Sequence, residues 1–232
     1  MVKATDFKAT LVEQPQPGEG YHVLPATAEN LQRIQDRWAG LQERVDQKLQ
    51  ALAGKSRAAE EKLIDQAVRA SSVPKRIFWL RKAADAMAAS VQGLAACRQG
   101  CSHCCHITTL ISRAEAQLIA KETGAAFNAD AGRFTKDNSS QEDAKGAAQE
   151  MFGKPCPFLR DRACSIYNSR PLTCRQLLNM DEDDLLCQLI EGNAPQVPYM
   201  NAMAHSVAAV AILGGHQDYD DIRNWFSAPA AT

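Results

Sequence analysis

The chain carries eight cysteines, and four of them crowd into one short stretch. Residues 97–106 read Cys-Arg-Gln-Gly-Cys-Ser-His-Cys-Cys-His. A short gap between two cysteines lets a tight turn point both thiolates at one metal ion, and the gap between Cys101 and Cys104 has this form. Cys104 and Cys105 are adjacent, and because neighbouring side chains diverge, they reach two different metal atoms more easily than one. A disulfide between adjacent residues is strained, which favours metal binding for this pair.

Three of the remaining cysteines lie where predicted local structure would gather them. Cys156 and Cys164 stand at the two ends of a predicted β-hairpin that turns at residues 160–162, so pairing of its strands brings them together. Cys174 falls in the first turn of a helix predicted to open at Pro171, where the positive end of the helix dipole favours a thiolate. The first cysteine loop is therefore expected to fold onto this hairpin and helix.

Cys187 follows four consecutive acidic residues, 181–184. Carboxylates can bind iron without sulfide, but a run of acids is more often a solvated turn. His106 follows the double cysteine and is an equally weighted candidate ligand, whereas His103 is expected to be a loop side chain beside the site. The candidate metal ligands are Cys97, Cys101, Cys104, Cys105, Cys156, Cys164, Cys174 and Cys187, with His106 as an additional candidate.

Two arginines and a tyrosine flank these cysteines. Arg170 could stabilise the negative charge of thiolate-bound metal or pair with a surface acid, and Arg175 has the same two interpretations. Tyr167 precedes Arg170 in the same segment. No catalytic residue is assigned, because no serine–histidine–acid arrangement and no phosphate-binding loop is present.

The compartment decides between metal binding and disulfides. Residues 1–6 contain no apolar run of the kind that opens a signal peptide, and no stretch reaches about 18 apolar residues. The sequence therefore predicts a cytoplasmic protein without a membrane span, in which disulfides are rare. The net charge of −1 favours neither nucleic acid nor an anionic membrane as a partner.

The N-terminal half is predicted to be helical. Residues 1–25 form an expected irregular arm rich in Pro and Gly, and a helix follows from Thr27 to Gly54. Further helices are predicted over 57–70 and from Pro74 to just before Cys97. Apolar residues recur every three or four positions in each helix, with Trp38, Leu49 and Val68 among those expected to face inward. Such stripes normally pack into a bundle, and the alternative is a surface for a protein partner or for self-association.

The remaining pattern completes a mainly α fold. Ser112 and Glu115 form a capping box that starts a helix ending near Gly124. An apolar helix over 200–213 carries His205, expected to be a hydrogen-bonded core residue, and a short helix follows around 222–226. The predicted architecture is a helical bundle with a cysteine-rich metal-binding core and one short β-hairpin. Its regions are the arm 1–25, the N-terminal helices 26–95, the cysteine cluster 96–190 and the C-terminal helices 191–232.

Thiolates are soft ligands that suit zinc or an iron–sulfur cluster. The spacing of the cysteines does not choose between the two metals. The cofactor expected is an iron–sulfur cluster or iron, with zinc as the alternative.

The order of the cysteine motifs resembles a known family. The run Cys97-x3-Cys101-x2-Cys104-Cys105 is followed by Cys156-Pro-Phe-Leu and by Cys164-x-Ile-Tyr-x-x-Arg-Pro-x-x-Cys174-Arg. This series is similar to the YkgJ-type cysteine-cluster proteins, which are described as zinc- or iron-chelating. The resemblance covers roughly residues 95–190, and it implies metal binding.

Three functions remain open from the sequence. The first is a metal-chelating or iron–sulfur protein with a redox, carrier or sensing role, favoured by the number of thiols and the vicinal pair. The second is a metal-dependent enzyme that modifies or oxidises a protein or peptide. The third is a structural zinc module that presents the N-terminal helices to a partner. An enzyme needs an open coordination position, whereas a structural zinc site is closed and colourless.

Overall fold

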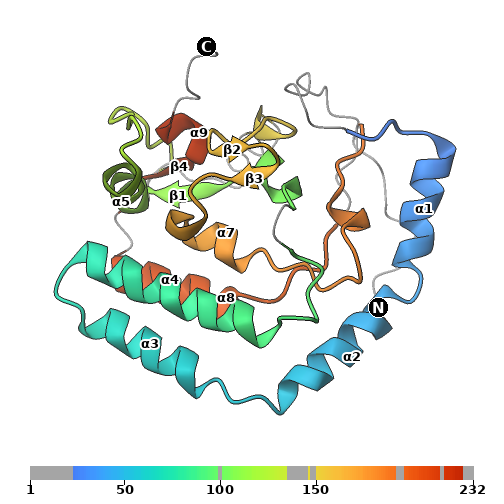
Figure 1. Ribbon diagram of the computed structural model, residues 1–232, viewed down its shortest axis with the longest axis horizontal. Coiled ribbons are helices and arrows are strands. Elements are labelled where there is room, and N and C mark those ends of the chain that lie inside the picture. The colour runs from blue at the N-terminus through green and yellow to red at the C-terminus, as the bar shows by residue number, and fades with distance from the viewer. Residues whose placement is uncertain are drawn as a thin grey trace.

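The computed structural model describes residues 23–98, 101–134, 146, 150–191, 196–214 and 217–226, and within them the fold is mainly helical, as predicted (Figure 1). The α-helices are α1 (Ala28–Trp38), α2 (Leu41–Ala53), α3 (Ala58–Arg69), α4 (Val73–Ser90), α5 (Arg113–Thr123), α7 (Leu172–Gln176), α8 (Met203–Leu213) and α9 (Ile222–Trp225). The strands are β1 (Leu110–Ser112), β2 (Leu159–Arg160), β3 (Ala163–Cys164) and β4 (Tyr219–Asp221). Short 3-10 helices are η1 (His103–His106), η2 (Tyr167–Ser169) and η3 (Leu185–Cys187). The predicted irregular arm lies outside the described residues except for 23–25.

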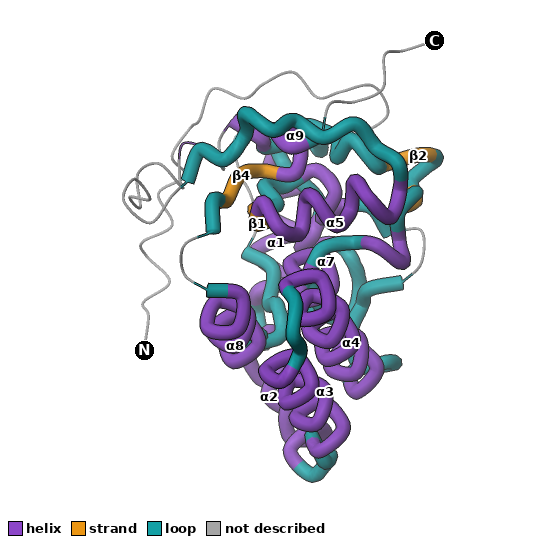
Figure 2. Tube along the Cα trace, turned by 90° about the vertical axis from the view of Figure 1, so that its left-hand side faces the viewer, coloured by secondary structure: helices purple, strands orange, loops and turns teal. Residues whose placement is uncertain are grey.

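Three helices, α3, α4 and α8, pack together as one layer of the molecule (Figures 1 and 2). Pro74 occupies the first turn of α4, as the sequence predicts. Ile77 and Leu80 of α4 are buried against Ala67 of α3 and Leu213 of α8. Burying each large apolar side chain stabilises the fold by about 1.5–3 kcal/mol, so this layer has a core of its own.

His205 makes a buried polar contact within that layer. Its Nε2 lies 2.5 Å from Oε1 of Glu60 on α3, and both residues are buried. The prediction of a hydrogen-bonded core histidine is confirmed.

A second layer is built around a two-stranded sheet that the sequence did not predict. Strand β1 pairs antiparallel with β4, with Leu110 opposite Asp221. Helix α5 begins directly after β1, and Ser112 caps it by accepting a hydrogen bond from the Glu115 amide at 3.3 Å, which confirms the capping box. Helix α9 follows β4 and buries Trp225 in the core of this layer. The sheet escapes prediction because its strands are short and far apart in sequence.

The predicted hairpin is present. Leu159 pairs with Cys164, and the turn between the strands consists of Asp161 and Arg162. Both turn residues have positive φ, 48° and 60°, which is the backbone of a tight two-residue hairpin turn. The hairpin packs Phe158 into the same core as Trp225.

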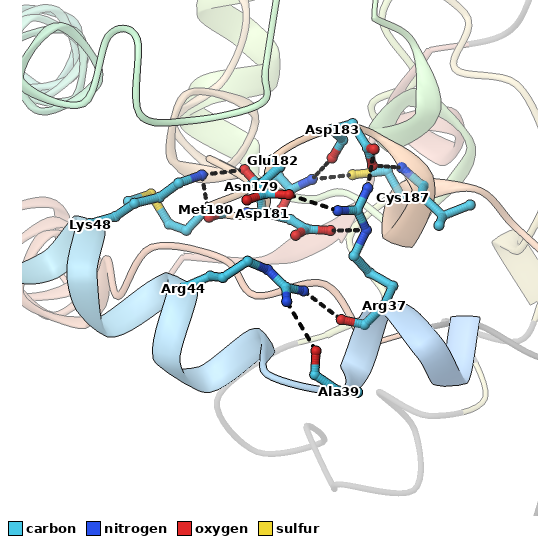
Figure 3. Close-up of polar contacts among 11 residues, drawn as sticks. Arg37, Ala39, Arg44, Lys48, Asn179, Met180, Asp181, Glu182, Asp183 and Cys187 are labelled. Carbon is cyan, nitrogen blue, oxygen red and sulfur yellow. Dashed lines mark hydrogen bonds and ion pairs between the residues drawn. The ribbon is translucent and has the colours of Figure 1, made fainter. Parts of the chain in front are cut away.

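The helix predicted from Thr27 to Gly54 is wrong in one respect, because it is two helices. Helix α1 ends at Trp38 and α2 begins at Leu41, with Gly40 between them at φ 70°. This left-handed conformation costs glycine little and most other residues much more. Arg44 stabilises the corner by donating to the carbonyl oxygens of Ala39 and Arg37 at 3.0 and 2.6 Å (Figure 3). The apolar spacing continues across the break and conceals it.

Three apolar residues predicted to face inward are exposed. The exposed fractions are 39% for Trp38, 42% for Leu49 and 59% for Val68. The bend at Gly40 gives α1 and α2 separate contact faces, and Ile34 and Leu41 are the residues that become buried. On α3 the neighbouring Ala67 takes the buried position in place of Val68.

Helices α1 and α2 pack on the segment that leads to Cys187, and α2 also contacts α4. Ile34 and Leu41 contact Leu186 and Ile190, and α1 lies against η3. The other end of α2 contributes to a cluster that includes Met180. The N-terminal helices are therefore placed beside the cysteine region. Among the described residues, none of the helices combines the length and apolar character needed to cross a bilayer.

Candidate metal centre

All eight cysteines are free thiols, and they come from four parts of the fold. Four belong to the loop after α4, which includes η1; two flank the β2–β3 hairpin; one lies in α7 and one ends η3. Cys97 is exposed, and the other seven are partly covered. The structure thus brings the loop, the hairpin and α7 into one region, as predicted.

Backbone hydrogen bonds fasten the cysteine loop to the start of the hairpin. The amide of Cys156 donates to the carbonyl oxygen of Cys105 at 2.8 Å. The amide of Gly153 donates to the carbonyl oxygen of His106 at the same distance. These two hydrogen bonds join segments that lie about 50 residues apart in sequence.

Arg223 of α9 strengthens this junction, and sequence reasoning missed it. Its guanidinium donates to the carbonyl oxygens of Cys105 at 2.8 Å and Lys154 at 2.7 Å, and to that of Ile107 at 3.2 Å. Asp221, which is fully buried, balances the charge at 2.8 Å. No local motif marks Arg223, because every carbonyl that it binds lies about 70 or more residues away along the chain.

Cys97 and Cys187 are linked through one asparagine. The backbone N–H of Asn179 donates to Cys97 Sγ at 3.3 Å. The side-chain Nδ2 of Asn179 donates to Cys187 Sγ, also at 3.3 Å. Nδ2 also donates to the carbonyl oxygen of Asp183 at 2.9 Å. Asn179 is buried, so it holds two sulfur atoms at fixed positions.

Cys101 lies beside two further side chains of types that can bind a metal. One ligand atom from each of Cys101, His103 and Asp184 falls within 4.8 Å of the other two. His103 Nε2 lies 3.1 Å from Asp184 Oδ2, and the amide of Cys187 donates to the Asp184 carbonyl oxygen at 3.0 Å. His103, which was expected to be a loop side chain beside the site, lies within this group. We call Cys97, Cys101 and Cys187 the outer cysteines.

The other group surrounds the hairpin. Cys156 accepts a hydrogen bond from the Leu159 amide at 2.9 Å through its carbonyl oxygen, and Leu159 pairs with Cys164. Cys156 and Cys164 both pack against the core that contains Trp225. Cys105 joins them through the hydrogen bond from the Cys156 amide to its carbonyl oxygen.

Burial keeps most of these thiols protonated when no cation is present. It raises the pKa of Cys174 well above its ordinary value and that of Cys156 to about 11. Burial also raises the pKa of Cys187, and the thiolate of Cys97 raises it further. A metal cation reverses this preference, because it stabilises the thiolate form. Such a set of thiols is suited to a soft metal such as zinc or iron.

Cys104 differs from the rest. A hydrogen bond from the Cys105 thiol lowers the pKa of Cys104 to about 7 and raises that of Cys105. The positive charge of Arg170 acts in the same direction on Cys104. The guanidinium carbon of Arg170 stands 4.0 Å from the centre of the Tyr167 ring, which holds the cation in place. The interpretation of Arg170 as a stabiliser of thiolate charge is supported.

Arg175 has a different role. It pairs with Asp85 of α4 at 2.5 Å and donates to the carbonyl oxygens of Asn168 and Arg170. These contacts join α7 to α4 and to η2, so Arg175 is a structural residue.

His106 is buried and lies 3.0 Å from the Ser102 carbonyl oxygen through Nδ1. Burial lowers its pKa to about 4, so the ring is neutral near pH 7. The compact group with Cys101 contains His103 and not His106. The geometry therefore favours His103 over His106 as a metal ligand.

The acidic run is only partly solvated, because Glu182 and Asp183 are about half exposed while Asp181 is buried. Asp181 is buried, and Arg37 of α1 places Nε 3.5 Å from its carboxylate (Figure 3). The Arg37 guanidinium also forms ion pairs with two further carboxylates. One is that of Glu182, at 3.0 Å, and the other is that of Asp183. Lys48 of α2 donates to the carbonyl oxygens of Met180 and Asp181 at 2.8 and 2.5 Å. The N-terminal helices thus clamp the segment between Asn179 and Cys187.

Replacement of Arg37 by Ala should destabilise this clamp strongly. The Asp181 carboxylate would remain buried without its cation, and such a loss typically costs about 3–5 kcal/mol. The free energy of unfolding, measured in urea, should fall by that order. Arg33→Ala, at an exposed position of the same helix, should change it by less than about 0.5 kcal/mol. Equal effects of the two changes would contradict the role of Arg37.

Asn179→Ala should weaken metal binding at the outer cysteines. The change removes the donor to Cys187 Sγ, and loss of a group that orients a metal ligand typically costs about 10–100-fold in affinity. Competition between the protein and a chromophoric chelator for Zn²⁺ measures the change. Asn201→Ala, at an exposed position before α8, is the matched control and should leave the affinity within about twofold. Unchanged affinity in Asn179→Ala would show that the bridge does not position the sulfur.

Comparison with known proteins agrees with this donor set. Residues 96–192 match the CxxCxxCC family, whose description is "Putative zinc- or iron-chelating domain". The matched segment contains all eight cysteines. No curated protein and no solved structure shows significant similarity to the chain.

Proposed function

We propose that the eight cysteines bind iron, as an iron–sulfur or iron–thiolate centre, in a redox or sensing role. The match of residues 96–192 to a family described as zinc- or iron-chelating supports the proposal. Metal chelation is the function that the family match supports. The metal, the ligands and the role are the proposal. Zinc in the same thiolates is the alternative.

The observation that carries the proposal is the gathering of eight thiols with one edge open to solvent. A structural zinc site is closed and uses four ligands. Here the number of thiols is larger, and Cys97 is exposed while the other seven are partly covered. An exposed edge gives an electron donor, a metal donor or a small oxidant access to the centre, which a closed site does not.

The charge around the thiols also favours a reactive centre. Several thiolates on one metal leave a net negative charge, which Arg170 offsets from its place on the Tyr167 ring. The positive charge of Arg170 favours the thiolate form of Cys97, Cys104, Cys164 and Cys174. Such compensation is one of the factors that set the reduction potential of an iron–sulfur centre.

Anaerobic purification followed by analysis of iron, zinc and acid-labile sulfide on one sample tests the proposal. Absorption spectra before and after addition of dithionite should show charge-transfer bands that bleach on reduction. A colourless protein with stoichiometric zinc would overturn the iron assignment and the redox role. It would leave a structural zinc module as the supported function.

A further inference from the structure

We propose that Cys101, His103 and Asp184 together bind one divalent metal ion, in a mixed sulfur, nitrogen and oxygen site whose fourth coordination position is open to solvent. One ligand atom of each residue lies within 4.8 Å of the other two. This site rests on the proposed function in one respect, because Cys101 is one of the eight cysteines proposed to bind metal. It adds two ligands that are not cysteines, and it does not depend on the redox role.

The separations between these side chains suit a single ion. His103 Nε2 lies 3.1 Å from Asp184 Oδ2. A nitrogen and an oxygen ligand, each about 2.0–2.2 Å from one tetrahedral ion, lie about 3.4 Å from each other. A cation can therefore replace this hydrogen bond with little movement of either side chain. A sulfur ligand at about 2.3 Å lies about 3.6 Å from its neighbours, so Cys101 Sγ has to approach by about 1.2 Å at most.

Two backbone turns from separate parts of the chain hold the ligands against each other. The Cys105 amide donates to the Ser102 carbonyl oxygen at 2.9 Å, which closes the turn of η1 that carries His103. The Cys187 amide donates to the Asp184 carbonyl oxygen at 3.0 Å, which places Asp184 at the start of η3. The imidazole and the carboxylate thus come from two short 3-10 turns, each fixed by its own hydrogen bond.

Asp184 is the acid of the run that lies against the cysteine loop. Arg37 of α1 pairs with the other three carboxylates, those of residues 181–183. The Asp184 carboxylate instead contacts His103, and its Oδ2 lies 3.6 Å from the Arg98 guanidinium. The Arg98 side chain is mostly exposed, and exposed ion pairs contribute little to stability. Arg98 can therefore move into solvent when a cation binds to the carboxylate.

The chemistry of the three donors favours an exchangeable ion. All three side chains are partly covered and none is fully buried. A site with three protein ligands and access to solvent takes water as its fourth ligand, as catalytic zinc sites do. A thiolate with an imidazole suits zinc or iron, whereas magnesium and calcium prefer oxygen donors alone. The ion at this site should therefore be Zn²⁺ or Fe²⁺, and a small anion should be able to replace its water.

Paramagnetic Co²⁺ tests the site because it reports each type of ligand separately. The metal-stripped protein is titrated with Co²⁺ while absorption and proton NMR spectra are recorded. A cysteine ligand gives a sulfur-to-cobalt charge-transfer band, and a histidine ligand gives a strongly shifted imidazole N–H resonance that disappears in D₂O. Wild type should show both signals, and His103→Gln should lose the N–H resonance. Azide should change the visible bands of the wild type, because an open position accepts an added ligand.

Asp184→Asn tests the oxygen ligand, since the amide keeps the size of the side chain and removes its charge. The dissociation constant of the ion that produces the N–H resonance should rise at least about tenfold, because loss of even a supporting group costs about 10–100-fold. Glu182→Gln is the matched control, at a half-exposed carboxylate of the same run, and should change this constant by less than about twofold. Circular dichroism checks that each variant keeps its helices.

The outcomes separate this site from metal binding by the cysteines in general. A charge-transfer band without the shifted N–H resonance, or a resonance that persists in His103→Gln, would overturn the mixed site while binding by the cysteines stands. Equal constants for Asp184→Asn and Glu182→Gln would also overturn it, because the oxygen ligand would be absent. A folded wild type without any charge-transfer band would overturn both the mixed site and the proposed function.

Discussion

Removal of the metal is expected to release the cysteine-bearing segments while the layer of α3, α4 and α8 remains folded. Binding of a structural metal contributes free energy on the order of 10 kcal/mol in zinc-finger peptides, and here that contribution acts on segments of irregular backbone. Hydrogen exchange should become at least about a hundredfold faster in residues 101–109 and 178–190, the equivalent of about 2.8 kcal/mol.

The helices provide the internal control for this experiment. The α3–α4–α8 layer has its own apolar core with Ile77 and Leu80 fully or almost fully buried. Amides in α3 and α4 should therefore change their exchange rates by less than about threefold on metal removal. Uniform acceleration across the chain would show that the metal supports the whole fold. Unchanged exchange in the cysteine segments would show that they are ordered without it.

Arg223→Ala is expected to destabilise the fold strongly. It leaves Asp221 buried and unpaired, and it removes the donor shared by three carbonyl groups at the junction of the cysteine loop and the hairpin. Breaking a buried ion pair from one side typically costs about 3–5 kcal/mol. Urea unfolding should show a loss of that size, and metal content per chain should fall with it.

Arg133→Ala is the matched control for that change. Arg133 also forms an arginine–carboxylate pair, with Glu150 at 2.7 Å, but about 45% of its side chain is exposed. Exposed pairs of this kind contribute less than about 1 kcal/mol. If Arg223→Ala were as mild as Arg133→Ala, the C-terminal segment would not be needed to position Cys105.

Local patterns predicted the parts of the molecule that depend on neighbours in sequence. The hairpin between Cys156 and Cys164 follows from its turn, and α5 follows from the capping box at Ser112. The helix break at Gly40 was missed because the apolar stripe continues through it, although a glycine in mid-helix is itself a warning.

The groups that organise the site depend on contacts across the chain, and these carry no local signal. Asn179 contacts Cys97 across 82 residues, Arg223 contacts Cys105 across 118 residues, and β1 pairs with β4 over a similar separation. Residues 181–184 were expected to form a solvated turn because four consecutive acidic side chains are seldom paired with a basic residue in the protein. Arg37 supplies that cation from a helix more than 140 positions earlier.

The central claim is that the cysteines are metal ligands. A count of reactive thiols in the native protein, followed by a total count under denaturing conditions, tests it most directly. The anaerobically purified protein is incubated with a thiol-reactive chromophore, with and without a strong chelator, while metal release is recorded on the same sample. The account predicts that thiols become reactive together with metal release and that all eight are recovered without a reductant. Thiols that react at once with no metal released, or fewer than eight until a disulfide reductant is added, would contradict it.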